Sequence, residues 1–125
     1  MITYLVISFA LLIIAGAAEG VMDHLQFHYT KPNHFWNPEF SWKNKYKGGD
    51  KRNGEKFFLS SSLLVWLTDG WHLMKFIRTC CLSIGVSTIL SMVGIYWLYS
   101  AVIGLGFMIV FKGAFTLVYN FLKST

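Results

Sequence analysis

Three acidic side chains lie within or beside segments that are otherwise apolar. Glu19 and Asp23 belong to "AAEGVMDHLQFH", and Asp69 belongs to "LVWLTDGWHLMKF", where it precedes His72 by three residues. A charged side chain at the centre of a membrane helix costs roughly 2.5–3.5 kcal/mol on insertion scales. Each of these acids is therefore expected to have a partner that compensates its charge.

Helical spacing groups these polar residues into two faces. Glu19 and Asp23 share one face of a helix, and His28 lies on the adjoining face. The second segment carries a mostly polar stripe with Asp69 beside it, formed by Ser61, Val65, Thr68, His72, Lys75 and Thr79. We expect the two faces to meet in an antiparallel helix pair.

The depth of the two acids supports this pairing. If the polar loop begins near residue 30 and ends near residue 57, Glu19 and Asp69 lie about 16 Å and about 18 Å from it, at a rise of about 1.5 Å per residue. Gly16 and Gly20 have the GxxxG spacing that allows a close helix crossing next to Glu19. A close crossing of the two helices is therefore allowed next to Glu19.

Carboxylates and imidazoles gathered in this way are ligands for divalent metals such as Zn, Mn or Fe. The metal would neutralise the acids, and a water bound to it would become a nucleophile. Two other interpretations stay open, namely a proton or ion pathway and a set of hydrogen bonds and ion pairs, including Lys75, that locks the helices together. The predicted metal ligands are Glu19, Asp23, His28, Asp69 and His72.

The composition is typical of an integral membrane protein. Of 125 residues, 54% are hydrophobic and 18% aromatic, and the mean hydropathy is +0.48. No charged residue occurs over residues 79–111, which is longer than the roughly 20 residues that one crossing needs. The N-terminal stretch "AGAAEG" has the small residues of a signal-peptide cleavage site, but "MITY" lacks Lys and Arg, so a retained helix is favoured.

We expect one all-α domain over residues 1–125, an integral membrane helical bundle with four transmembrane helices. The expected helices cover residues 3–29, 57–78, 79–99 and 101–122, with a tight turn near residues 100–106. The alternative keeps the second helix at the membrane interface and gives three crossings. Adjacent Cys80 and Cys81 are expected to pack as apolar residues, and Lys112 is expected to reach the interface or to face the bundle interior.

Residues 30–56 form a basic, aromatic loop. It holds seven of the 11 Lys and Arg residues and three acids, a net charge of +4. The positive-inside rule places this loop in the cytoplasm, in a multi-pass protein of the inner cell membrane. Membrane lipids are the expected partners, and no nucleic acid is expected because no nucleic-acid-binding module is present.

The first half of the loop, "HFWNPEFSWKNKYK", has two interpretations. It is either an aromatic belt with lysines directed to lipid phosphates, or a structured lid that binds a headgroup. In the second case asparagines fix the turns, namely Asn33, Asn37 and Asn44. The predicted phosphate ligands are Lys43, Lys45 and Lys47, whereas His34 is expected to be a surface residue.

Three stretches in order, "EGVMDHLQFHY", "FWNPEFSWKNKYK" and "LTDGWHL", resemble a family of small, uncharacterised bacterial integral membrane proteins. That family has a Glu/Asp/His helix, a Trp-Asn-Pro…Ser-Trp-Lys-Asn-Lys loop and a Thr-Asp-Gly-Trp-His segment. The likeness covers residues 19–72. It implies a membrane protein and implies no activity.

The sequence therefore favours a membrane-embedded metal-binding protein, interpreted as a metal-dependent enzyme that acts on a lipid or lipid-linked phosphate at the cytoplasmic surface. The alternative is a non-enzymatic membrane subunit, or a small ion- or proton-conducting homo-oligomer with a buried polar cluster. The sequence leaves open whether the chain is an enzyme.

Overall fold

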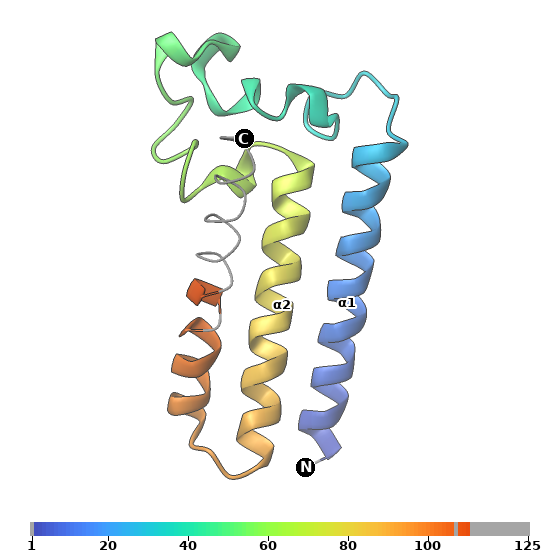
Figure 1. Ribbon diagram of the computed structural model, residues 1–125, viewed down its shortest axis with the longest axis vertical. Coiled ribbons are helices and arrows are strands. Elements are labelled where there is room, and N and C mark those ends of the chain that lie inside the picture. Colours follow the sequence, from blue (N-terminus) through green and yellow to red (C-terminus); the bar gives the residue numbers. More distant parts are fainter. Residues whose placement is uncertain (1, 107, 111–125) are drawn as a thin grey trace, which may run out of the picture. The chain divides into compact units, whose positions relative to one another are not determined.

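The computed structural model describes residues 2–106 and 108–110, and the regular elements of this part of the chain are helices (Figure 1). Helix α1 covers Ile2–Phe27, and helix α2 covers Gly70–Met92. A shorter apolar helix, Trp97–Val110, follows and includes residue 107, which is not described. The described residues contain no β-strand, so the all-α prediction is confirmed for them.

The segment between α1 and α2 is built from short 3-10 turns. An isolated antiparallel bridge between Tyr46 and Glu55 closes its most basic part. The turns are η1 (Pro38–Phe40), η2 (Lys43–Lys45), η3 (Lys47–Gly49), η4 (Lys51–Asn53) and η5 (Val65–Leu67).

Helices α1 and α2 are both long and apolar enough to cross a membrane. Their large apolar side chains are mostly exposed, as shown by Phe9 and Ile13 in α1 and Ile84 in α2. Exposed apolar helix surfaces of this extent are normal where a helix faces lipid. The predicted fourth helix covers residues 101–122, and its part from residue 111 onward, including Lys112, lies outside the described residues.

The predicted bounds of the second and third helices are wrong. Instead of a helix over residues 57–78 and another over 79–99, α2 begins at Gly70 and continues through Thr79 to Met92. Residues 57–69 form turns, because the fully buried Ser60 hydroxyl binds loop backbone and the Asp69 side chain binds the first turn of α2. The next turn occupies residues 93–96, where Gly94 has a φ of 85°.

The chain divides into two compact units, residues 14–78 and residues 1–13 with 79–125. In the second of these, Ser87 Oγ lies 2.9 Å from the carbonyl oxygen of Ser100. Gly104 approaches the same serine so closely that an added Cβ would lie 2.2 Å from Ser87 Oγ. Small residues let helix backbones approach in this way inside a membrane, so the uncharged C-terminal stretch carries a packing signal.

In the unit of residues 14–78, the buried side of α1 is a stripe with a spacing of three and four residues. It consists of Ala15, Ala18, Met22 and Leu25. The close approach that Gly16 and Gly20 would allow is not made in the described chain, because a Cβ added at either glycine meets no atom within 4 Å. Close packing follows the alanines instead.

The start of α2 is packed against the loop. A Cβ added at Gly70 would lie 2.2 Å from Cε3 of Trp36, so no other residue fits there without moving the indole. The Gly70 N–H donates a hydrogen bond of 2.7 Å to the carbonyl oxygen of Phe35. Gly70 therefore allows the loop to lie directly on the first turn of the helix.

Replacing Gly70 by alanine is expected to destabilise the protein by roughly 1–3 kcal/mol, the usual cost of forcing an extra carbon into a packed site. Thermal unfolding of the detergent-solubilised protein, followed by circular dichroism, measures the effect. Gly20→Ala is the matched control, because Gly20 is a helix residue with open space around it. Gly20→Ala should leave stability unchanged or raise it, and equal melting of Gly70→Ala and wild type would contradict the packing argument.

Candidate functional site

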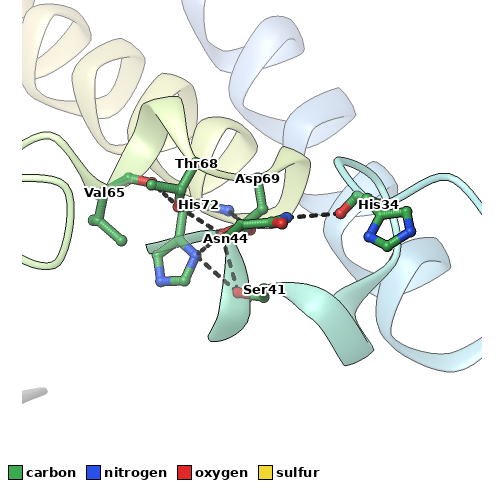
Figure 2. Close-up of polar contacts among 7 residues, drawn as sticks. All are labelled: His34, Ser41, Asn44, Val65, Thr68, Asp69 and His72. Atoms are coloured by element: carbon green, nitrogen blue, oxygen red, sulfur yellow. Dashed lines mark hydrogen bonds and ion pairs between the residues drawn. The ribbon is translucent and has the colours of Figure 1, made fainter. Parts of the chain in front are cut away.

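The Asp69 carboxylate is the centre of a buried hydrogen-bond network (Figure 2). Its side chain is 1% exposed. Oδ1 accepts a 3.0 Å hydrogen bond from the backbone N–H of His72. Oδ2 lies 2.7 Å from His72 Nδ1 and 3.0 Å from both Ser41 Oγ and Thr68 Oγ1. Both carboxylate oxygens are thus occupied by groups of the protein itself.

Local helix chemistry explains why Asp69 and His72 are three residues apart. Asp69 directly precedes α2, and its side chain accepts the N–H of the third helical residue, which is the N-cap arrangement. A carboxylate at this end also complements the helix dipole. The prediction that Asp69 lies deep within a membrane helix is therefore wrong, because the helix begins immediately after it.

The loop motif and the "TDGWH" motif are two sides of one contact. Ser41 bonds Asp69, and Trp36 packs on Gly70. Between them, Asn37 Oδ1 accepts the Glu39 N–H at 3.0 Å and caps η1. The predicted role of the three asparagines in the turns is confirmed, since Asn33 also accepts the Phe35 and Trp36 amides, and Asn44 Nδ2 donates to the His34 carbonyl oxygen at 2.7 Å (Figure 2). Binding of a headgroup by this loop stays a prediction.

The pKa of Asp69 is set by opposing effects. Burial favours the neutral carboxyl and raises its pKa, but hydrogen bonds from His72 and Ser41, together with the charge of His72, outweigh burial. The net result is a pKa below the ordinary value for aspartate. Because the ionised carboxylate accepts hydrogen bonds, the pairing assigns a proton to His72 Nδ1.

When the ring of His72 is neutral, this assignment leaves Nε2 with a lone pair, whereas the protonated ring, which adds its charge next to Asp69, has none. No hydrogen-bond partner for Nε2 occurs among residues 2–106 and 108–110, and the His72 side chain is 20% exposed. An imidazole whose other nitrogen is held by a carboxylate is the arrangement of a general base or a metal ligand. Ser41 Oγ lies 3.4 Å from Nδ1, so it is not placed like the nucleophile of a Ser-His-Asp triad, which faces Nε2.

The structure places the other predicted metal ligands separately. Glu19 forms an ion pair with Arg78. Asp23 is exposed in the last turns of α1, and His28 is exposed just after its end. Within the described ranges, no group of three or more His, Cys, Asp or Glu side chains is positioned to hold a metal ion. Of the five residues, the structure brings together Asp69 and His72, and the five-ligand site stays a prediction.

The expectation that the acids have partners holds for Glu19 and Asp69, but the partners differ from those named from the sequence. Arg78, rather than Lys75, pairs with Glu19. Ser41 was missed because it comes from a loop 28 residues away from Asp69. The sequence feature that could have indicated Arg78 as a partner is its position as the last charged residue before the uncharged stretch of residues 79–111.

The three predicted phosphate ligands have different surroundings. The Lys43 ammonium lies 5.4 Å from the ring centroid of Phe40, in cation–π contact. Lys45 is held by its backbone, since its carbonyl oxygen accepts the Ser60 hydroxyl at 2.7 Å. The Lys47 side chain is exposed.

Comparison of the chain with protein-family models, curated proteins and solved structures finds no match. The function is therefore argued from the geometry.

Replacing Asp69 by alanine is expected to lower stability by more than the roughly 0.5–2 kcal/mol of an N-cap, because His72 and Ser41 also lose their acceptor. Asp69→Asn keeps a side-chain oxygen that can accept the helix amide, so it should lower stability less than Asp69→Ala does. Thermal unfolding compares the two variants with Asp23→Asn, which alters an exposed carboxylate. Equal losses for Asn and Ala would show that capping by the side-chain oxygen is unimportant.

The lowered pKa of Asp69 also predicts a pH dependence. A carboxyl group whose folded pKa lies below the unfolded value of about 3.9 stabilises the fold fully above that value, and this contribution is lost as the pH falls through the folded pKa. The difference in unfolding free energy between wild type and Asp69→Asn should therefore be constant near neutral pH and shrink below about pH 4. A difference that grows in acid would reverse the sign of the assigned shift.

Proposed function

We propose that the chain is a membrane protein in which His72 acts as a general base on a lipid or lipid-linked phosphate at the cytoplasmic surface of the cell membrane. The observation that carries this proposal is the Asp69–His72 pair, in which a buried carboxylate holds Nδ1 at 2.7 Å and leaves Nε2 without a partner in the described chain. Neutral imidazole is suited to proton transfer near pH 7.

In this proposal Asp69 is a positioning residue. Its hydrogen bonds from Ser41 and Thr68 fix the carboxylate, and the carboxylate fixes the ring orientation of His72. In the reaction, Nε2 accepts a proton from water while the water oxygen bonds to phosphorus. The bond from phosphorus to the ester oxygen of the lipid breaks, and the leaving alkoxide is protonated from solvent.

Ligation of a divalent metal, Zn, Mn or Fe, is the other role that we propose for Nε2, in place of the general base. His72 Nε2 would supply one ligand, and the carboxylate behind it supports such a role because ligating histidines usually bond a carboxylate through their other nitrogen. Glu19, Asp23 and His28 remain the candidates for further ligands, from the same chain or from a second copy in a homo-oligomer. Asp69 is the least suited of the five, since both its oxygens accept protein hydrogen bonds.

The second candidate is a non-enzymatic membrane subunit or an ion- or proton-conducting oligomer. It is favoured by the completeness of the polar network, because every buried side-chain nitrogen and oxygen in the described part of the chain has a hydrogen-bond partner. The Glu19–Arg78 ion pair likewise serves helix association without any chemistry.

The test is phosphate release by the full chain in vesicles of phosphatidylcholine and phosphatidic acid. His72→Gln should reduce kcat by roughly 10²–10⁴-fold, the usual contribution of a general base. Asp69→Asn should lower kcat more than it raises KM and should shift the pH profile, which a merely structural role would not do. His24→Gln, which alters an exposed imidazole of α1, is the control and should match wild type.

Elemental analysis of protein purified without chelator separates the two roles of Nε2. A stoichiometric metal that disappears in His72→Gln supports metal ligation, and activity without such a metal supports the base alone. Failure of the wild type to release phosphate, or equal release by folded His72→Gln, would overturn the proposal. Ion flux through proteoliposomes that Glu19→Gln abolishes would support the second candidate.

A further inference from the structure

The turns between α1 and α2 surround a hollow of about 360 Å³. The residues that line it are His34, Phe40, Lys43, Asn44, Tyr46, Gly48, Gly49 and Lys56. All of them belong to the unit of residues 14–78. No carboxylate lines this hollow, although the surrounding loop contains three acids.

The nearby acids are occupied elsewhere. Asp50 forms an ion pair of 2.7 Å with Arg52. Glu55 accepts the backbone N–H of Leu59 at 3.0 Å and that of Ser61 at 3.1 Å.

Within the described ranges, therefore, neither Lys43 nor Lys56 has a carboxylate partner. Two uncompensated ammonium groups around one hollow create a local positive potential that favours an anion.

The backbone at both lysines is held by its surroundings, and both side chains are exposed. The stem of Lys43 lies along Gly49, where an added Cβ would lie 3.4 Å from Lys43 Cβ, and its ammonium lies near two aromatic rings. The backbone of Lys56 is held because its backbone N–H donates a hydrogen bond of 2.9 Å to the Lys45 carbonyl oxygen, which also accepts the buried Ser60 hydroxyl. A site arranged before binding loses less entropy when a ligand enters.

Gly48 and Gly49 are required by the backbone at this wall. Their φ values are 61° and 75°, in the left-handed region that glycine adopts without strain. On the other wall, Asn44 Nδ2 holds the carbonyl oxygen of His34 at 2.7 Å. Part of the wall of the hollow is thus formed by the folded backbone of the loop.

We propose that this hollow binds a phosphate group, with Lys43 and Lys56 as its cationic ligands. Two ammonium groups match the charge of a phosphate monoester, and lysine binds phosphate as a point charge. The choice of phosphate over other anions rests on the proposed function. The phosphate belongs either to a lipid headgroup or to a free phosphate, and the two sources share this chemistry. Of the three lysines named from the sequence, this assigns Lys43 to the site, with Lys56 in place of Lys45 and Lys47.

The hollow is linked to the His72 pair by a single turn. Ser41 bonds Asp69 and lies 3.4 Å from His72 Nδ1, while its neighbours Phe40 and Lys43 line the hollow. A phosphate held by Lys43 would therefore be bound by the same turn that contacts the proposed base.

Calorimetric titration of the full chain in a zwitterionic detergent with inorganic phosphate tests the site. Lys43→Met and Lys56→Met should each weaken binding by roughly tenfold, the loss of one charge-assisted interaction. Lys45→Met and Lys47→Met remove the same charge from the same loop and should change affinity less than about twofold if binding is local. Circular dichroism verifies that each variant is folded.

A second arm identifies the source of the phosphate. The chain is reconstituted in nanodiscs of phosphatidylcholine with or without phosphatidic acid, and protection of Lys43 and Lys56 from amine labelling is measured. Protection by phosphatidic acid supports a lipid headgroup, and protection by inorganic phosphate alone supports a free phosphate. Absence of binding by both probes, or equal losses in all four lysine variants, would overturn the inference.

Phosphate binding and phosphate release, measured on the wild type, His72→Gln and the lysine variants, separate this inference from the proposed function. Intact, lysine-dependent phosphate binding without any hydrolysis by the wild type would remove the general-base proposal and retain the phosphate site. Hydrolysis that depends on His72 but is unaffected by Lys43→Met and Lys56→Met would do the reverse.

Discussion

The buried carboxylate of Asp69 is the interaction on which the described polar part of the chain depends. One oxygen caps the first turn of α2, and the other holds His72, Thr68 and the loop residue Ser41. A carboxylate without these donors would be expensive at 1% exposure, so helix start, ring orientation and loop position are fixed together. The removal of any one donor affects the other two elements through the same two oxygens.

The loop is attached to α2 at two adjacent points. Trp36 covers the Cα of Gly70, and Ser41 reaches the residue before it. Between these points η1 is short and capped at both ends, since Asn37 accepts the Glu39 amide and the Ser41 N–H donates to Pro38. These contacts order the first half of the loop on the start of α2.

The sequence was sufficient to predict the helical class, the length of α1 and the need of Glu19 and Asp69 for partners, because these follow from composition and from the cost of burying charge. It was insufficient for the start of α2. The run "FFLSSSLLVWL" is apolar enough to be interpreted as helix, although the Asp69–Gly70 pair is a local N-cap signal. The start of α2 after this run depends on Ser60, whose hydroxyl donates a hydrogen bond to a carbonyl oxygen 15 residues earlier in the chain. No local sequence pattern contains such a contact.

The residues of the candidate site likewise fall into those that the sequence predicts and those that it does not. Asp69 and His72 were found by their types and spacing, and the structure pairs them. Ser41 and Arg78 could not be assigned, because each partnership joins residues far apart in the chain and depends on loop geometry or helix rotation. Helical periodicity gave the faces of Glu19 and Asp23, but it could not show that Asp23 would remain exposed near the end of α1.

The hydrogen bond from Ser87 to the carbonyl of Ser100 has a consequence for how the helices that it joins can separate. It joins α2 to the helix that follows it, across a turn of only a few residues, and Gly104 leaves no space for a side chain between them. On α2 alone the Ser87 hydroxyl still has an acceptor, because the carbonyl oxygen of Ser83 lies 2.9 Å from Oγ. A hydroxyl donates one hydrogen, so the carbonyl of Ser100 is an alternative acceptor, and the two helices can separate and rejoin without leaving Ser87 unpaired in apolar surroundings.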